Sequence, residues 1–98
     1  KNKYDLKIEV EVKNQAELEE AIELNVDRIL LDNMTIKEMR GAVKISNGRI
    51  PLEASGNVTL ENVRAIAETG VDYISSGALT HSVKAMDISF LIEGVNGG

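Results

Sequence analysis

Two Ser-Gly pairs are the residues of this chain whose type and position best suit the binding of an anion. Ser55-Gly56 lies in the segment LEASGNVT, and Ser76-Gly77 lies in ISSGALTHS, 21 residues further on. Each pair follows a short β-like run and precedes a possible helix start. Glycine lets the backbone approach a ligand closely, and the N–H groups that follow can point at an anion. If the two turns end neighbouring strands, they form a two-walled cradle for a phosphate group.

Acidic side chains end two other strand-like runs. Glu11 shares one face of the first run with Glu9, and Asp32 closes the second run. Active sites of α/β proteins lie at the carboxyl edge of the sheet, where these residues are expected. Two carboxylates there suit Mg²⁺, which accepts a few carboxylates together with water and phosphate oxygens, and they equally suit ribose hydroxyls. A solvated polar face is the alternative interpretation.

His81 is the single histidine of the chain and lies four residues after Gly77. Its place in the second candidate phosphate loop favours contact with an anion, and a surface or capping role is the alternative. No serine or cysteine is evidently paired with it, so a nucleophilic triad is not supported.

These residues sit in a repeating strand-then-helix pattern. Runs of β-branched residues and leucine predict strands over 6–12, 28–31, 50–54 and 73–75. Amphipathic stretches predict helices over 15–24, 36–46 and 60–68, with N-caps at Asn14, Thr35 and Thr59. Thr35 and Glu38 also have the spacing of a capping box.

An internal repeat supports this organisation, because residues 25–29 (NVDRI) resemble residues 70–74 (GVDYI), 45 positions later. That distance equals two βα units, and alternating units of this length predict a parallel sheet with right-handed crossovers. Residues 87–92 alternate in polarity like a final strand. The predicted fold class is therefore α/β: half of a TIM-type barrel, with about four βα units plus a final strand. The alternative is the same set of units flattened toward a flavodoxin-like open sheet.

Length and composition limit the chain to a single domain over residues 1–98, with 1–5 and 93–98 expected as loose ends. Hydrophobic residues make up 43% of the chain, which is enough for a globular core. The net charge of −5 and the scattered lysines and arginines argue against nucleic-acid binding. No cysteine, signal peptide or membrane-spanning apolar run is present, which predicts a cytoplasmic protein without membrane contact.

The segments that carry these residues resemble the C-terminal part of the quinolinate phosphoribosyltransferases (nicotinate-nucleotide pyrophosphorylases, carboxylating). They follow the family's order and cover nearly all of residues 6–92: KIEVEV (7–12), LLDNM (30–34), LEASGNVT (52–59), AETGVDYISSGALTHS (67–82) and MDIS (86–89). The resemblance implies a glycosyltransferase of NAD biosynthesis that joins quinolinate to the ribose carbon of phosphoribosyl pyrophosphate, with Mg²⁺ required. The products are nicotinate mononucleotide, pyrophosphate and carbon dioxide.

By this resemblance, Glu11 and Asp32 contact the ribose and the metal region of the sugar pyrophosphate. The 5-phosphate is held by Ser55, Gly56 and Asn57 and by a second loop, which contains Gly77, Ala78 and His81. Asn57 departs from the family pattern, which commonly has a second glycine there. This change affects how closely the backbone can approach the phosphate.

The resemblance also implies what the chain lacks. In the family, the cationic residues that grip the two quinolinate carboxylates come mostly from segments before the matched part, and the site is built across a dimer. We therefore expect a half-barrel that retains phosphoribosyl pyrophosphate or phosphate binding, is inactive alone and self-associates as a homodimer. The alternative is an engineered or excised fragment with at most weak phosphate binding.

Overall fold

Strands and helices alternate along most of the chain, as the sequence pattern predicts. A computed structural model describes residues 7–75 and 82–88. Its elements, in order, are β1 (Glu9–Val12), α1 (Gln15–Glu23), β2 (Arg28–Asp32), α2 (Ile36–Ser46), β3 (Leu52–Ser55), α3 (Val63–Ala67), β4 (Tyr73–Ser75), β5 (Val83–Lys84) and a 3₁₀ turn, η1 (Ala85–Asp87).

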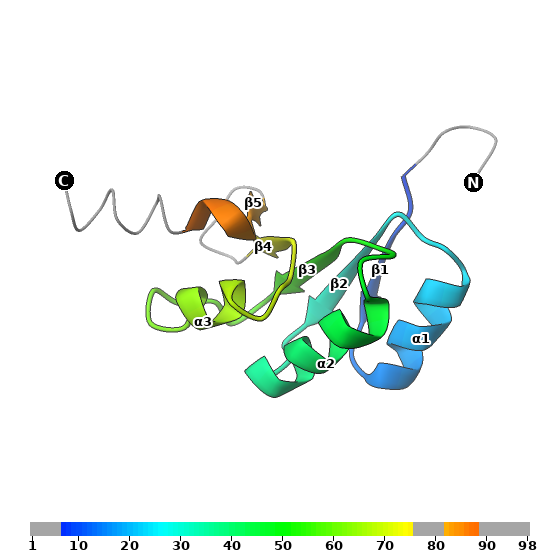
Figure 1. Cartoon of the computed structure of the whole chain (residues 1–98), viewed down its shortest axis with the longest axis horizontal. Helices are drawn as coiled ribbons and strands as arrows, with labels where there is room; N and C mark the ends of the chain where they lie inside the picture. Colours follow the sequence, from blue (N-terminus) through cyan, green and yellow to red (C-terminus); the bar gives the residue numbers. More distant parts are fainter. Residues whose placement is uncertain (1–6, 76–81, 89–98) are drawn as a thin grey trace.

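The strands form one sheet in the order β1-β2-β3-β4-β5. The first four strands are parallel, and β5 is antiparallel to β4. The three α-helices all lie on the same side of the sheet (Figure 1). A sequential strand order with helices on one face is typical of half a (β/α)₈ barrel, whereas a flavodoxin-like sheet has its first strand inside the sheet and helices on both faces. The predicted α/β half-barrel class is confirmed.

One face of the sheet packs against the helices and forms the core. Its strand residues include Val12, Leu31, Ala54 and Ile74, all of which are fully buried. Leu18 of α1, Met39 of α2 and Ile66 of α3 belong to the same hydrophobic cluster. Because strand side chains alternate between faces, the intervening residues fall on the face that no helix covers. This second face carries the polar residues that the sequence singled out.

The predicted N-caps of the first two helices are confirmed. The side chain of Asn14 accepts a hydrogen bond from the N–H of Glu17 at 2.9 Å. Thr35 and Glu38 form a capping box, in which each side chain accepts a bond from the other residue's N–H.

The predicted start of the third helix is wrong, since α3 begins at Val63 and not at residue 60. Thr59 instead exchanges hydrogen bonds with Asn62: each side chain accepts from the other residue's backbone N–H, at 3.2 and 2.7 Å. This pair closes a separate turn ahead of α3. Thr59 caps this separate turn and not α3, so a helix predicted to begin just after Thr59 starts three residues too early.

The internal repeat is also a structural repeat. Asn25 and Gly70 both have positive φ angles, 56° and 102°. Two residues after each lies an aspartate whose carboxylate accepts a hydrogen bond from an N–H at the start of the neighbouring strand. Asp27 accepts from Ile8 at 2.8 Å, and Asp72 accepts from Leu52 at 2.9 Å. The repeated Asp therefore ties two parallel strands together at their amino ends.

The final strand differs from the prediction. The fifth strand is the two-residue β5, which pairs with β4 through Tyr73↔Lys84 and Ile74↔Val83. Asp87 ends η1 and Ile88 continues helically, so the predicted strand does not begin at 87, and residues 89–92 lie outside the described residues. The N–H of Ala85 donates to the carbonyl of Asp72 at 2.9 Å, which ends the pairing of β5. A two-residue strand is too short to show alternation.

The expected loose ends, 1–5 and 93–98, lie outside the described residues. Within residues 7–75 and 82–88, no helix has the length and apolar character needed to cross a bilayer.

Candidate functional site

The carboxyl ends of the parallel strands bring several of the predicted site residues together. Asp32 at the end of β2 pairs with Ser55 of β3, and Ser55 pairs with Ser75 of β4. These three residues form one row across the uncovered face. Glu11 lies on the adjacent strand opposite Leu30, two residues before the level of Asp32. The structure therefore places Glu11, Asp32 and Ser55 at one edge of one face, as predicted.

Lys13 links the two acidic residues of this edge. Its Nζ lies 3.8 Å from Oε1 of Glu11 and 3.6 Å from Oδ2 of Asp32. The backbone N–H of Lys13 donates to Glu17 of α1 at 2.7 Å, which holds the end of β1 against the start of that helix. Sequence reasoning did not single out Lys13. The available signal was its position two residues after Glu11, on the same face of the strand.

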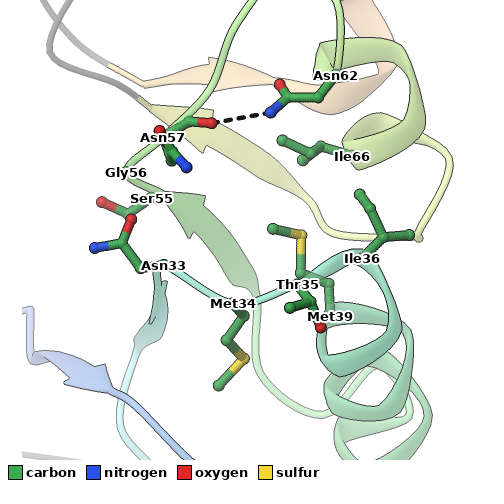
Figure 2. Close-up of a pocket in the computed structure, with 10 residues that line it drawn as sticks. All are labelled: Asn33, Met34, Thr35, Ile36, Met39, Ser55, Gly56, Asn57, Asn62 and Ile66. Carbon is green, nitrogen blue, oxygen red and sulfur yellow. Dashed lines mark hydrogen bonds between the residues drawn. The ribbon is translucent and has the colours of Figure 1, made fainter.

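The turn after β3 has the backbone conformation that close approach to an anion requires. Gly56 and Asn57 both have positive φ angles, 87° and 31°. Asparagine is one of the few residues that tolerate the left-handed region, so Asn57 can adopt this conformation without being a glycine. The carbonyl of Asn57 accepts a hydrogen bond from Nδ2 of Asn62 at 2.9 Å, which fixes the turn from the helix side (Figure 2).

Gly56 is also closely approached by the side chain of Asn33. A Cβ added there would collide with Oδ1 of Asn33 and lie 3.0 Å from its Cγ. The N–H of Asn33 in turn donates to the carbonyl of Ser55 at 3.0 Å. Asn33 therefore packs against the turn from the end of β2.

The amide groups of this turn are the clearest ligand-binding feature of the edge. Among the described residues, no group accepts a hydrogen bond from the N–H of Gly56, Asn57 or Val58. Successive N–H groups in a turn with positive φ angles make an anion-binding concavity. α3 has only five residues, so its dipole adds little, and the attraction rests on the N–H groups themselves.

A cavity of about 330 Å³ opens beside the same turn, between α2 and α3. Figure 2 shows Ser55, Gly56 and Asn57 along its rim, with Ile36, Met39 and Ile66 along its walls. This cavity lies on the helix side of the turn, whereas Glu11 and Asp32 lie on the uncovered face. The turn therefore separates a pocket with apolar walls on the helix side from a polar edge on the uncovered face.

A partly buried ion pair lies below the edge on the uncovered face. Nη1 of Arg28 donates to Oε1 of Glu53 at 3.0 Å. The guanidinium of Arg28 also lies over the ring of Tyr73, 3.9 Å from its centroid. Glu53 is only 6% exposed even though no helix covers it, because these neighbours enclose it. The sequence alone did not reveal that Glu53 has this partner on β2.

The remaining predicted residues are not tested. Gly77, Ala78 and His81 lie outside the described residues. In residues 7–75 and 82–88, no group of three or more His, Cys, Asp or Glu side chains is arranged to hold a metal. A cation at Glu11 and Asp32 would therefore take its other ligands from water or from a bound anion.

Parallel βα units with acidic groups and a glycine turn at the carboxyl edge define the chain as part of a barrel-type domain of the α/β class. A family model described as "Quinolinate phosphoribosyl transferase, C-terminal domain" matches residues 1–91. The chain belongs to the quinolinate phosphoribosyltransferase family.

Individual relatives agree with this assignment. Quinolinate phosphoribosyltransferase [decarboxylating] 1b from Nicotiana tabacum is 48% identical over 107 residues, which cover 94% of this chain and 31% of the relative. A probable nicotinate-nucleotide pyrophosphorylase from Synechocystis sp. is 50% identical over 92 residues, with 91% and 31% covered. The crystal structure of nicotinate-nucleotide pyrophosphorylase from Ehrlichia chaffeensis superposes with a TM-score of 0.75 at 51% identity, covering 82% of this chain and 29% of that one. The chain thus spans about a third of the length of these relatives.

Proposed function

We propose that this chain forms the part of a quinolinate phosphoribosyltransferase that binds phosphoribosyl pyrophosphate. The complete reaction joins the ribose carbon of that compound to quinolinate and releases pyrophosphate and carbon dioxide, with nicotinate mononucleotide as the product. The observation that carries the proposal is the turn at Ser55–Asn57. There, consecutive N–H groups with no acceptor in the described part of the chain lie beside two carboxylates at one edge of the sheet.

In this proposal the turn holds the 5-phosphate. The N–H groups of Gly56, Asn57 and Val58 donate to phosphate oxygens, and the hydroxyl of Ser55 adds a fourth donor from the end of β3. Gly77, Ala78 and His81 are proposed as the opposite wall. Donors that the protein has already positioned lose little freedom on binding, so they fix the ribose relative to the sheet edge.

Glu11 and Asp32 are proposed to receive the ribose hydroxyls and a Mg²⁺ ion. Their carboxylates fit a cation, because one ammonium nitrogen already lies within 3.8 Å of both. Carboxylates are also the side chains that Mg²⁺ prefers. When bound, Mg²⁺ neutralises charge on the pyrophosphate leaving group. The carboxylates themselves orient the sugar by accepting hydrogen bonds from its hydroxyls.

The chain alone is proposed to be inactive toward quinolinate. On the uncovered face, Lys13 is engaged by Glu11 and Asp32, and Arg28 is engaged by Glu53. In the metal-free chain, these two cations are therefore not free to grip a dianion. We propose that the groups that do so lie in the remaining two thirds of the longer relatives. Purified protein given quinolinate, phosphoribosyl pyrophosphate and Mg²⁺ should form no nicotinate mononucleotide above the uncatalysed background, and measurable turnover would contradict this.

The phosphate site is tested by titrating ¹⁵N-labelled protein with ribose 5-phosphate in metal-free buffer. We expect the amide signals of Gly56, Asn57 and Val58 to move, and unphosphorylated ribose to leave them in place. Gly56→Ala should abolish these shifts, because the new Cβ meets Asn33.

The matched control is Gly48→Ala. Gly48 also has a positive φ, 80°, but a Cβ there meets nothing within 4 Å, and it lies between α2 and β3 at the other end of the sheet. Gly48→Ala therefore carries similar backbone strain and should keep the shifts. If ribose 5-phosphate moves other amides and leaves the turn unchanged, the phosphate site is wrongly placed.

A further inference from the structure

The ammonium of Lys13 lies where a cation must lie to contact both acidic residues of the site. It is 3.8 Å from Glu11 and 3.6 Å from Asp32, which belong to adjacent strands. The lysine side chain is 64% exposed, whereas that of Asp32 is only 22% exposed. The carboxylate is therefore held in place by the sheet, while the lysine is a long side chain that extends from solvent onto it.

This arrangement partly compensates the charge of the acidic pair. Two carboxylates at neighbouring strand ends repel each other, and one ammonium group between them offsets that repulsion. It neutralises only one of the two negative charges. A divalent cation at the same place would neutralise both, but it cannot share that place with an ammonium group of the same sign.

We propose that Lys13 is an exchangeable counterion of the Glu11–Asp32 pair: its ammonium occupies the cation position in the metal-free protein and leaves when a divalent cation binds. This rests on the proposed function for the placement of the cation at these two residues. The exposed, flexible lysine stem allows the ammonium to swing away while the strand ends stay fixed. Lys13 therefore weakens the binding of metal alone.

The experiment uses Mn²⁺ alone as the probe, measured by water-proton relaxation and by paramagnetic broadening of the amide signals at residues 11 and 32. Exposed ion pairs are individually weak, so loss of both contacts in Lys13→Met should tighten Mn²⁺ binding by about three- to tenfold. Lys13→Arg keeps the positive charge and should stay within about twofold of the unaltered protein.

The matched control is Lys7→Met. It removes the same charge from an exposed lysine just before β1, at the opposite end of that strand. At about 0.15 M salt its distant charge is largely screened, so its effect on Mn²⁺ affinity should stay below about twofold.

A second measurement needs no variant. In the unaltered protein, saturation with diamagnetic Mg²⁺ should shift the NMR signals of the Lys13 side chain, because its two ion pairs break. Three results would each overturn the proposal: equal Mn²⁺ affinity for Lys13→Met and Lys7→Met, no broadening at residues 11 and 32 in any variant, or no Mg²⁺-dependent change at Lys13. The ribose 5-phosphate titration contains no metal, so failure of the phosphate site is detected separately.

Discussion

Replacing Arg28 with methionine tests how the uncovered face of the sheet is held together. Methionine keeps most of the length of the side chain but removes the guanidinium that joins β2, β3 and β4. Glu53 would then lose its partner at 3.0 Å while remaining enclosed, since its side chain is only 7% exposed. The contact between Arg28 and the ring of Tyr73 would be lost as well.

The expected loss of stability follows from these exposures. Breaking a fully buried ion pair by removing one partner costs about 3–5 kcal/mol, because the other charge stays buried and uncompensated. Arg28 is 29% exposed, so water can partly replace it, and we expect a smaller loss, of about 2–3 kcal/mol. For a chain of this size, that corresponds to a fall in melting temperature of about 8–24 °C.

Urea unfolding followed by circular dichroism measures this loss, with two further variants for comparison. Arg40→Met removes an arginine from an exposed position on α2 and should change the free energy of unfolding by less than about 0.5 kcal/mol. The double variant Arg28→Met/Glu53→Leu removes both charges and should recover most of the loss. A loss below about 0.5 kcal/mol for Arg28→Met, or a double variant less stable than the single one, would refute the reasoning.

Three other predictions concern stability and association. Gly41→Ala should raise the free energy of unfolding by about 0.5–1 kcal/mol, because Gly41 lies inside α2 and a Cβ there meets nothing within 4 Å. A urea titration measures this change, and a lower free energy of unfolding for the variant would contradict the prediction. Asp72→Ala should cost about 1–3 kcal/mol, because the N–H of the buried Leu52 loses its acceptor, and an unchanged urea midpoint would contradict this. The chain should also self-associate through β1 and β5, the edge strands of the sheet. Light scattering over a wide dilution range measures the molar mass, and a monomer at millimolar concentration would exclude this self-association.

The elements that could be predicted from the sequence are those whose signals are local. Asn14 and the Thr35–Glu38 box mark helix starts through residues three apart, and both form as expected. The NVDRI and GVDYI repeat predicted equivalent units, and the paired roles of Asp27 and Asp72 confirm it. Positive φ at Gly56 likewise follows from a glycine in a turn.

Features that depend on tertiary contacts could not be predicted in the same way. The two residues of β5 become a strand only because β4 lies beside them. Arg28 and Glu53 are 25 positions apart, and only the parallel register of β2 and β3 shows that they share a face and can pair. Lys13 reads in the sequence as a lysine that precedes a helix, and its role depends on Asp32 of the next strand.

The pairing of charges on the uncovered face would allow a chain with a net charge of −5 to bind an anionic sugar phosphate, as we propose. Arg28 neutralises Glu53 below the edge, and Lys13 partly neutralises Glu11 and Asp32 at the edge. Repulsion of the ligand is thereby reduced without leaving a free side-chain cation among these residues. In the proposed function, the phosphate is held by the N–H groups of the turn after β3, whereas the dicarboxylate is held by groups in the remaining two thirds of the longer relatives. Phosphate recognition and dicarboxylate recognition should therefore be separable in this family, and this chain should retain the first without the second.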